Sequence, residues 1–313
     1  MHAAVVRSFD LPPRYEEVPE PDPAAAAGEV VDVLAAGLHQ RVRSSANGTH
    51  YESTGALPFV PGIDGVGRTA AGELVYFVLP DTLDGSFADR VVVDRRRTVV
   101  VPADVDPVLL AAAMNPAMSS WVALRRRIEL EPGAAVLVLG ATGAAGSLAV
   151  QIARHLGAGH VVAAGRDAER LATVGADRAV TLDELDAAAD VDVVLDYLWG
   201  DVTAAAMPSM LRARSDRGRP LRWVEIGAVT GPTVPLASEW LRAARLAIVG
   251  SGQGSVPTAD IAAELAELAA FVTAGGLTVD VEPVPLADVE AAWSRRSRAR
   301  TVLVPSGAAP DRR

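Results

Sequence analysis

The chain has 313 residues, half of them hydrophobic, and a formal net charge of −10. This length is enough for two domains, and the negative charge argues against a nucleic acid as partner. No run reaches the roughly 18 apolar residues that span a bilayer. Residues 1–7 lack the basic and apolar segments of a secretory signal, so we expect a cytoplasmic protein without a membrane partner.

Cysteine and lysine are both absent from the sequence. Without cysteine there is no disulfide, no thiolate nucleophile and no cysteine-ligated zinc. Without lysine there is no Schiff-base chemistry and no Tyr–Lys catalytic pair. Arginine triplets at 95–97 and 125–127 have acidic residues nearby and no interleaved aromatic residues, so we interpret both as solvated surface.

The first 110 residues are predicted to be mostly β structure. Short apolar stretches between turn signals predict strands at 3–6, 29–35, 73–78, 86–93 and 98–101. Residues 106–114 and the stretch through 130 have a helical pattern. We expect Asn115-Pro116 to interrupt it, because the residue before a proline disfavours the helical conformation.

The pattern changes at Gly133, where apolar runs of five or six residues begin to alternate with helical segments. Continuous apolar strands separated by helices are typical of a parallel sheet covered on both faces. The sequence therefore predicts an α/β fold with a doubly wound sheet. The last elements leave this alternation and are expected to return the chain to the first domain. The predicted strands are 135–139, 161–165, 178–182, 191–195, 221–226 and 246–250, followed by helix 259–273, strand 278–284, helix 286–293 and strand 300–304.

The strongest local motif is the turn Gly140-Ala141-Thr142-Gly143-Ala144-Ala145-Gly146. It directly follows the predicted strand 135–139 and opens an apolar helix, which is the context of a dinucleotide-binding fingerprint. Small residues let the backbone approach a pyrophosphate, and the helix N-terminus offers unpaired N–H groups and a favourable dipole. We interpret the turn as a cofactor phosphate site rather than a merely tight structural turn.

The end of the second strand of this unit favours NADPH. NAD sites usually place an acidic residue there to bind the ribose 2′-hydroxyl, whereas this chain has Gly165 followed by Arg166. A guanidinium can bind a 2′-phosphate with two hydrogen bonds and keeps its charge. Asp167 is expected to cap the next helix; if it faced the ribose instead, the preference for NADPH would weaken.

Four segments of the chain carry a recognisable pattern: residues 57–67, with the element Pro61-Gly62-Ile63-Asp64-Gly65-Val66-Gly67, and residues 85–89, 131–133 and 191–196. Together they resemble the medium-chain dehydrogenase/reductase superfamily, in its zinc-free quinone oxidoreductase-like branch. The resemblance implies a Rossmann domain, residues 119–267, inserted in a mostly β GroES-like domain, residues 1–118 with 268–313. It also implies an active site in the cleft between them.

Two regions depart from the zinc-dependent branch of that superfamily. Where those enzymes carry a catalytic cysteine and a Gly-His-Glu element, this chain has Gly37-Leu38-His39-Gln40 and Gly62-Ile63-Asp64. The resemblance therefore implies no metal site and no Lewis acid, and it favours an activated acceptor: a quinone or an α,β-unsaturated carbonyl. Two alternatives stay open: an enoyl reductase acting on a thioester or natural-product intermediate, and a non-catalytic NADPH-binding protein.

Tyr51 and His50 lie in the loop where relatives place a tyrosine near the substrate. Tyr51 either hydrogen-bonds the substrate oxygen or packs on the wall of the cleft. His50 either donates the proton or is an incidental loop residue. Asp64 is expected to hold backbone N–H groups in a turn at 62–67 rather than to act as an acid.

Further cofactor contacts are predicted near the domain junction and after later strands of the parallel sheet. Asn115 either contacts the nicotinamide or caps a helix, and Trp199 with Tyr197 either flanks the nicotinamide or packs in the core. Arg298 and Arg300 are expected to lie at the surface, with a contact to the adenosine phosphate as the alternative. Residues 246–250 could form the edge of a homodimer. The predicted cofactor contacts are Asn115, Ser119, Trp199, Ile226, Gly227, Ser251, Gly252 and Gln253.

Overall fold

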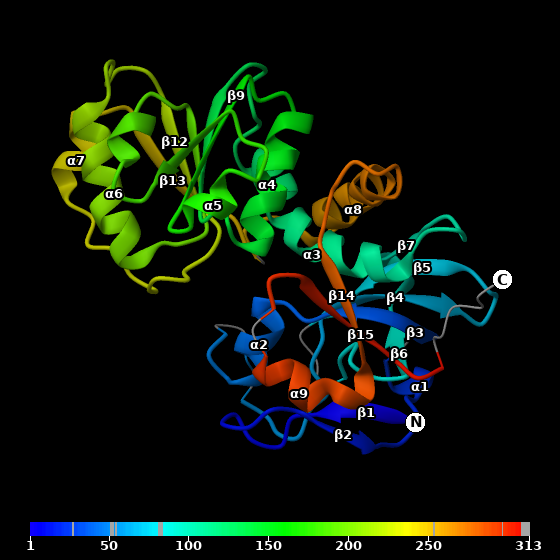
Figure 1. Ribbon diagram of the computed structural model, residues 1–313. Coiled ribbons are helices and arrows are strands. Elements are labelled where there is room, and N and C mark those ends of the chain that lie inside the picture. Colours follow the sequence, from blue (N-terminus) through cyan, green and yellow to red (C-terminus); the bar gives the residue numbers. More distant parts are fainter. Residues whose placement is uncertain are drawn as a thin grey trace. The chain divides into compact units, whose positions relative to one another are not determined.

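The computed structural model describes residues 1–26, 28–50, 53, 55–80, 84–252, 254–295 and 297–307. The chain forms two compact units (Figure 1). Unit 1 consists of Met1–Asn115 and Leu265–Arg313, and unit 2 of Pro116–Glu264. The chain passes from one unit to the other inside two helices, α3 (Pro107–Val122) and α8 (Thr258–Thr273).

Unit 2 is built on a six-stranded parallel sheet in the order β10-β9-β8-β11-β12-β13. The chain starts at the centre, moves outward twice, and then returns to the centre to build the other half. This is the Rossmann order, and its switch point lies between β8 and β11. The strands are β8 (Ala135–Leu139), β9 (His160–Gly165), β10 (Arg178–Thr181), β11 (Val193–Asp196), β12 (Leu221–Glu225) and β13 (Leu246–Gly250).

Helices flank this sheet because its strands are apolar on both faces. Buried side chains of β8, β9, β11 and β12 form a core with Met207 and Met210 of α6, and the indole of Trp223 lies fully buried within it. The doubly wound prediction is thereby confirmed. The helical segments are α4 (Ala144–His155), α5 (Ala168–Leu171), η3 (Leu185–Ala188), α6 (Gly200–Ala213) and α7 (Ser238–Ala243).

Unit 1 contains a seven-stranded sheet in which β14 and β15 are parallel and the other pairs are antiparallel. The last strand, β15, pairs with β3, so the end of the chain does return to the first domain. A small antiparallel pair, β1 and β2, completes the unit. The strands are β1 (His2–Val5), β2 (Arg14–Glu17), β3 (Glu29–Gly37), β4 (Asp64–Thr69), β5 (Leu74–Val78), β6 (Arg90–Val93), β7 (Thr98–Val100), β14 (Val281–Pro285) and β15 (Arg300–Val304).

The helices of unit 1 are short apart from its shares of α3 and α8. Side chains of β3, β5 and β6 form its core with Leu286, Val289 and Ala292 from the C-terminal segment. Unit 1 is thus mostly β, as expected for the part of the chain outside the parallel sheet. The helical segments are α1 (Pro23–Ala26), α2 (Gln40–Ala46), η1 (Arg95–Arg97), η4 (Leu286–Asp288) and α9 (Val289–Ser294).

The interruption predicted at Asn115-Pro116 is wrong, because α3 runs continuously through Pro116. Ala111, Ala112 and Ala113 in the preceding turn are fully buried. We attribute the continuity to this packing, which outweighs the one backbone hydrogen bond that a proline removes. The segment Pro107–Arg127, α3 with the π-helical turn Ala123–Arg127, is long and apolar enough to cross a membrane by length and composition. Its most apolar window is 67% buried inside the fold, as in a core helix.

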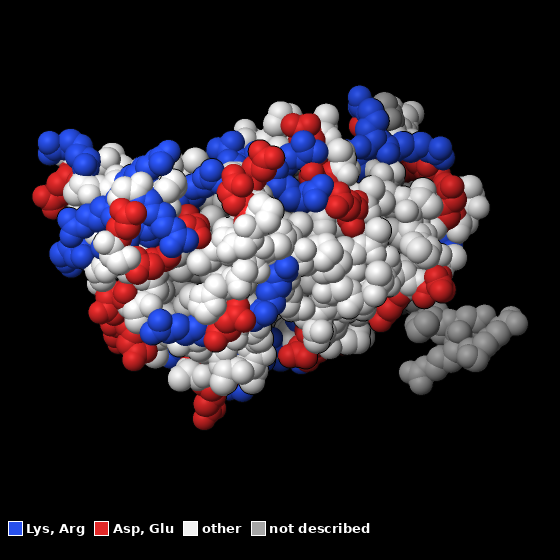
Figure 2. All heavy atoms as spheres, turned by 90° about the horizontal axis from the view of Figure 1, so that it is seen from above, with Lys and Arg blue, Asp and Glu red and all other residues white. Residues whose placement is uncertain are grey.

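The two arginine triplets differ in their surroundings. Arg95 and Arg96 are exposed and pair with Glu29 and Asp94, as predicted for solvated surface. In the second triplet, by contrast, Arg125 and Arg126 both pair with the carboxylate of Glu264, which is only 3% exposed. The Arg125 and Arg126 side chains are themselves 33% and 40% exposed, so this triplet also lies at the surface as predicted, and Glu264 is the buried member of the group. On the face drawn in Figure 2, arginine and acidic side chains lie interleaved.

Candidate functional site

The glycine turn connects β8 to α4 at the carboxyl edge of the parallel sheet. Gly140 has a φ of 87°, and no side chain caps α4 at its N-cap residue, Gly143. A Cβ atom on Gly146 would lie 2.2 Å from the carbonyl oxygen of Gly140, so only glycine fits there. The backbone of the turn is thus packed tightly against the helix start. The uncapped N-terminus of α4 offers N–H groups and a positive dipole end to a phosphate.

The end of β9 lies against this turn. A Cβ atom on Gly165 would lie 3.0 Å from Cγ2 of Thr142, so the turn leaves little room for an acidic side chain at this position. Arg166 is exposed and makes no hydrogen bond or ion pair with the described residues. Asp167 caps α5 by accepting a hydrogen bond from the N–H of Arg170 at 3.0 Å, as predicted. The Arg166 guanidinium is therefore available for a ligand, whereas the acid beside it is engaged.

Asp196 at the end of β11 organises the next turn. Its fully buried carboxylate accepts hydrogen bonds from the N–H groups of Leu198 and Trp199, from the Thr203 hydroxyl and from the Trp223 indole, at 2.5–2.9 Å. Trp199 adopts a φ of 49°, unusual for a residue other than glycine, and packs on the core of unit 2. Of the two alternatives for Trp199, this packing supports the core one.

Ser119 and Tyr197 are brought together within unit 2. The Ser119 hydroxyl donates to the carbonyl of Pro116 at 2.7 Å, so it accepts the hydrogen bond from the Tyr197 hydroxyl at 3.0 Å. Burial raises the pKa of Tyr197 to about 12, and its hydroxyl therefore keeps its proton. Asn115, by contrast, lies in the middle of α3, which excludes the alternative that it caps a helix.

The remaining predicted cofactor residues follow the carboxyl ends of β12 and β13, at the end of the sheet where the glycine turn also lies. The N–H groups of Ile226 and Gly227 both bond the carbonyl of Asp196. Ser251 donates its N–H to the carbonyl of Glu225, and Gly252 bonds the Ser255 hydroxyl. Gln253 lies outside the described residues. Burial, with the charge of Asp196, raises the pKa of the half-buried Glu225 on this edge.

The two predicted catalytic residues follow α2 in unit 1. The N–H of His50 bonds the carbonyl of Ser44 at 3.0 Å, which folds the loop back onto that helix. Tyr51 lies outside the described residues. The roles proposed for both residues stay predictions.

Sequence reasoning missed a buried polar cluster in unit 1. The Asp64 side chain is not a backbone cap in a turn: Asp64 begins β4, and its Oδ1 lies 2.9 Å from Nε2 of His39. Its Oδ2 accepts a hydrogen bond from the Tyr76 hydroxyl at 2.9 Å. Arg300, expected at the surface, has buried Nε and Nη2 atoms near Asp64, whereas Arg298 is exposed as predicted. A signal for this cluster was present in the sequence. His39 and Asp64 lie in the two segments that replace the zinc-binding elements of the zinc-dependent branch.

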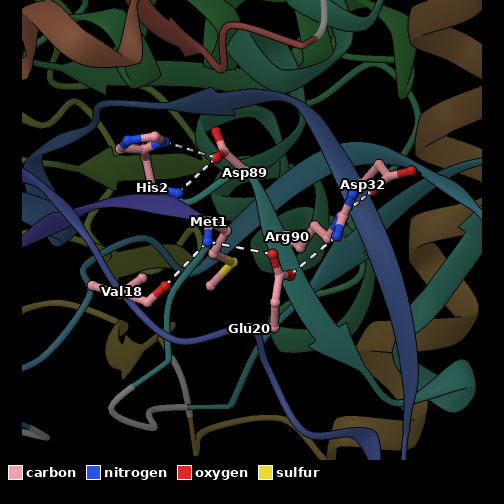
Figure 3. Close-up of polar contacts among 7 residues, drawn as sticks. All are labelled: Met1, His2, Val18, Glu20, Asp32, Asp89 and Arg90. Atoms are coloured by element: carbon pink, nitrogen blue, oxygen red, sulfur yellow. Dashed lines mark hydrogen bonds and ion pairs between the residues drawn. The ribbon is translucent and has the colours of Figure 1, made fainter.

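A second set of polar contacts lies around the start of β1 (Figure 3). The Asp89 carboxylate accepts a hydrogen bond from the backbone N–H of His2 at 2.6 Å, and Arg90 pairs with Asp32 and Glu20. These groups border a hollow of about 410 Å³ in unit 1. The charged groups of this set pair with one another, and we assign no ligand to this hollow.

Comparison with known proteins finds relatives along nearly the whole chain, whereas no protein-family model matches. The probable NADPH-dependent quinone reductase tdiC of Emericella nidulans is 33% identical over 97% of this chain and 100% of that protein. The quinone oxidoreductase of Thermus thermophilus, solved alone and with NADPH, has a TM-score of 0.81 at 27% identity, covering 97% of this chain and 100% of that one. A phenolphthiocerol/phthiocerol polyketide synthase of Mycobacterium tuberculosis is 32% identical over 64% of this chain and 10% of that protein.

Proposed function

Since the chain belongs to the zinc-free quinone oxidoreductase-like branch of the medium-chain dehydrogenase/reductase superfamily, we propose that it is an NADPH-dependent oxidoreductase that transfers hydride to a quinone or an α,β-unsaturated carbonyl compound. The observation that carries the proposal is the turn between β8 and α4. It combines a close backbone approach at Gly146 with an uncapped helix start, beside the switch point of the sheet.

NADPH fits the residues beside this turn better than NADH. The N–H groups of Gly140, Ala141 and Gly143 already bond carbonyls of the chain, so those of Thr142 and of the helix start, Ala144 to Gly146, would hold the pyrophosphate. Arg166 would pair with the 2′-phosphate. Asp167, the only acid next to Arg166, is used as the cap of α5, which removes it as a ribose ligand. When bound, NADPH supplies the hydride. We assign the cofactor domain to residues 119–267 and the substrate domain to 1–118 with 268–313.

The acceptor class follows from the missing ligand set of the zinc-dependent branch. The sequence has no cysteine, and Ile63 stands where that branch has histidine. Without a Lewis acid to polarise an alcohol or aldehyde, the acceptor must already be electrophilic, as quinones and enones are. Similarity to a part of a polyketide synthase keeps enoyl reduction of a thioester as the second candidate.

The experiment that tests the proposal is an acceptor screen. NADPH oxidation is followed at 340 nm with quinones, enones and enoyl thioesters, each repeated with NADH. We expect turnover with quinones or enones and a clear preference for NADPH. Activity with thioesters alone would establish the enoyl reductase instead. Tight NADPH binding without oxidation by any acceptor would establish a non-catalytic NADPH-binding protein.

We also propose a cytoplasmic homodimer that pairs through β13. This strand is the outer edge of the six-stranded sheet, so one side of its backbone has no partner strand within the unit. Leu246, Ile248 and Val249 keep part of their apolar surface exposed, and Leu241 of the preceding helix is 46% exposed. A second copy pairing edge to edge would cover this surface.

A further inference from the structure

The cluster of His39, Asp64, Tyr76 and Arg300 in unit 1 holds polar groups that the proposed function does not yet use. Tyr76 is fully buried, and Asp64 and His39 are 1% and 5% exposed. They come from three separate segments: β4, β5 and the residue before α2. Burying such groups is costly unless they are paired, so their arrangement calls for an explanation.

The hydrogen bonds fix where the His39 ring carries its proton. Burial, together with the charge of Asp64, raises the pKa of Tyr76 well above 10, so its hydroxyl stays protonated and donates to Oδ2 of Asp64. The other oxygen, Oδ1, then accepts from Nε2–H of His39 at 2.9 Å. In the neutral ring this leaves Nδ1 without a proton. Proton gain and loss by His39 therefore take place at Nδ1.

The cluster has hydrogen-bonding groups that none of the described residues satisfies. Among the described residues, Nδ1 of His39 has no hydrogen-bond partner. Nε and Nη2 of Arg300 are buried and also lack a partner there. A buried donor left unsatisfied costs about 1–3 kcal/mol. A purely structural network would be expected to satisfy these groups, whereas the oxygen of a bound molecule would satisfy both side chains.

The surroundings of His39 lower the pKa of its ring. Burial lowers the pKa of His39, the hydrogen bond and charge of Asp64 oppose this, and the charges of Arg300 and Arg41 lower it further. The charged and titratable groups that act on the ring are thus Asp64, Tyr76 behind it, Arg300 and Arg41. An anion arriving beside Nδ1 would raise the pKa of the ring and favour its protonation.

We propose that this cluster binds the oxygen of a quinone acceptor, with Arg300 donating hydrogen bonds to it and His39 delivering the proton that completes the reduction. The inference rests on the proposed function. Hydride transfer gives the quinone two electrons and one hydrogen and leaves a phenolate oxygen. The Nδ1–H of the His39 imidazolium passes its proton to that oxygen, which gives the hydroquinone and a neutral ring. Solvent then returns one proton to Nδ1, and Asp64 acts as the positioning residue.

The kinetic test compares His39→Gln with the wild type and with His160→Gln, a control in which an exposed histidine of unit 2 is replaced. With a quinone, His39→Gln should lower kcat about 100-fold and leave the Kd for NADPH unchanged. The wild-type kcat/KM should fall as the pH rises above the lowered pKa of His39, and His39→Gln should lose this dependence. Added imidazole should restore part of the activity to His39→Ala.

A second test needs no cofactor. The probe is 4-nitrophenolate, whose absorbance reports whether its oxygen is ionised. We expect the wild type to bind it and Arg300→Gln to bind it at least 10-fold more weakly. In the NMR spectrum of the wild type, the probe should raise the pKa of the His39 ring. Circular dichroism and thermal melting establish that each variant is folded.

Two results would overturn the inference. One is a folded His39→Gln enzyme that reduces quinones with the wild-type rate and pH profile. The other is 4-nitrophenolate binding that neither His39→Gln nor Arg300→Gln weakens. Failure of the wild type to oxidise NADPH with any acceptor would instead refute the proposed function, and the binding test separates the two failures.

Discussion

The carbonyl oxygen of Gly140 lies where a side chain on Gly146 would have to go, 2.2 Å from an added Cβ atom. Replacing Gly146 by alanine must therefore push the start of α4 away from the turn. We expect Gly146→Ala to lower stability by about 1–3 kcal/mol and to weaken NADPH binding at least 10-fold. Isothermal titration calorimetry and thermal melting measure the two effects.

Gly143→Ala is the graded control for this prediction. An added Cβ there would lie 3.2 Å from the same oxygen, a contact that a small shift relieves. It should weaken NADPH binding less than Gly146→Ala does. Equal effects of the two substitutions would show that the close approach at Gly146 does not shape the phosphate site.

Arg166 is predicted to select NADPH over NADH. Its guanidinium is exposed and has no partner among the described residues, so pairing with a 2′-phosphate breaks no existing contact. Arg166→Gln should raise the Kd for NADPH about 10- to 100-fold, equivalent to about 1.4–2.8 kcal/mol, and leave that for NADH unchanged. Fluorescence titration with each cofactor measures this.

Arg178→Gln removes the same charge at the amino end of β10, on the opposite edge of the sheet. It should leave both affinities as they are. If Arg166→Gln weakened NADH and NADPH equally, Arg166 would contribute general attraction and not recognition of the 2′-phosphate.

Local patterns predicted the parallel sheet well because each of its strands is a continuous apolar run followed by a recognisable turn. β13 has the predicted bounds, and Asp167 caps its helix as expected. The pattern failed where glycine replaces apolar residues. In β4, Gly65 and Gly67 occupy alternate positions, so its sequence lacks the apolar–polar alternation of a strand and predicts a turn instead.

Contacts between distant segments were beyond local patterns. His39 and Asp64 are 25 residues apart, and Arg125 and Glu264 are 139 apart, so no spacing rule joins either pair. Each of these four residues is of a polar or charged type that is common in surface loops and helices. The burial of His39, Asp64 and Glu264 depends on how the segments around each of them pack within its unit. A short window of sequence does not contain this information.

Glu264 is predicted to stabilise unit 2 at neutral pH. Its carboxylate accepts hydrogen bonds from the Trp121 indole at 2.8 Å and from Arg125 and Arg126 at 2.6 Å. A glutamine in its place has one acceptor oxygen instead of two and no charge, so the hydrogen bonds from the two guanidinium groups are weakened or lost. We expect Glu264→Gln to lower the free energy of unfolding by about 3 kcal/mol at pH 7, measured by urea denaturation. Glu239→Gln, which replaces an exposed carboxylate in α7 of the same unit, should change it by less than about 0.5 kcal/mol.

The effect of Glu264 should depend on pH in a defined direction. Burial raises the pKa of Glu264, but hydrogen bonds from Trp121 and Arg125 and the charge of Arg125 outweigh it and bring the pKa below its ordinary value of 4.5. A carboxyl with a lowered pKa stabilises the fold above its unfolded pKa, and this stabilisation is lost as the pH falls through the folded value. The difference in the free energy of unfolding between the wild type and Glu264→Gln should therefore become smaller below pH 4.5. A difference that stays constant down to pH 3 would contradict the stabilising role of the Glu264 charge.

The β13 edge predicts how the oligomer can be broken. Ala247 is exposed in the middle of this strand, and a lysine there would place two like charges near each other across an antiparallel edge pair. We expect Ala247→Lys to convert a dimer into a monomer in light scattering coupled to gel filtration, with thermal stability of the fold retained. Val100→Lys is the matched control, because Val100 is a 63%-exposed apolar residue on the edge strand β7 of unit 1. A dimer that survives Ala247→Lys but dissociates with Val100→Lys would show that the interface lies in unit 1.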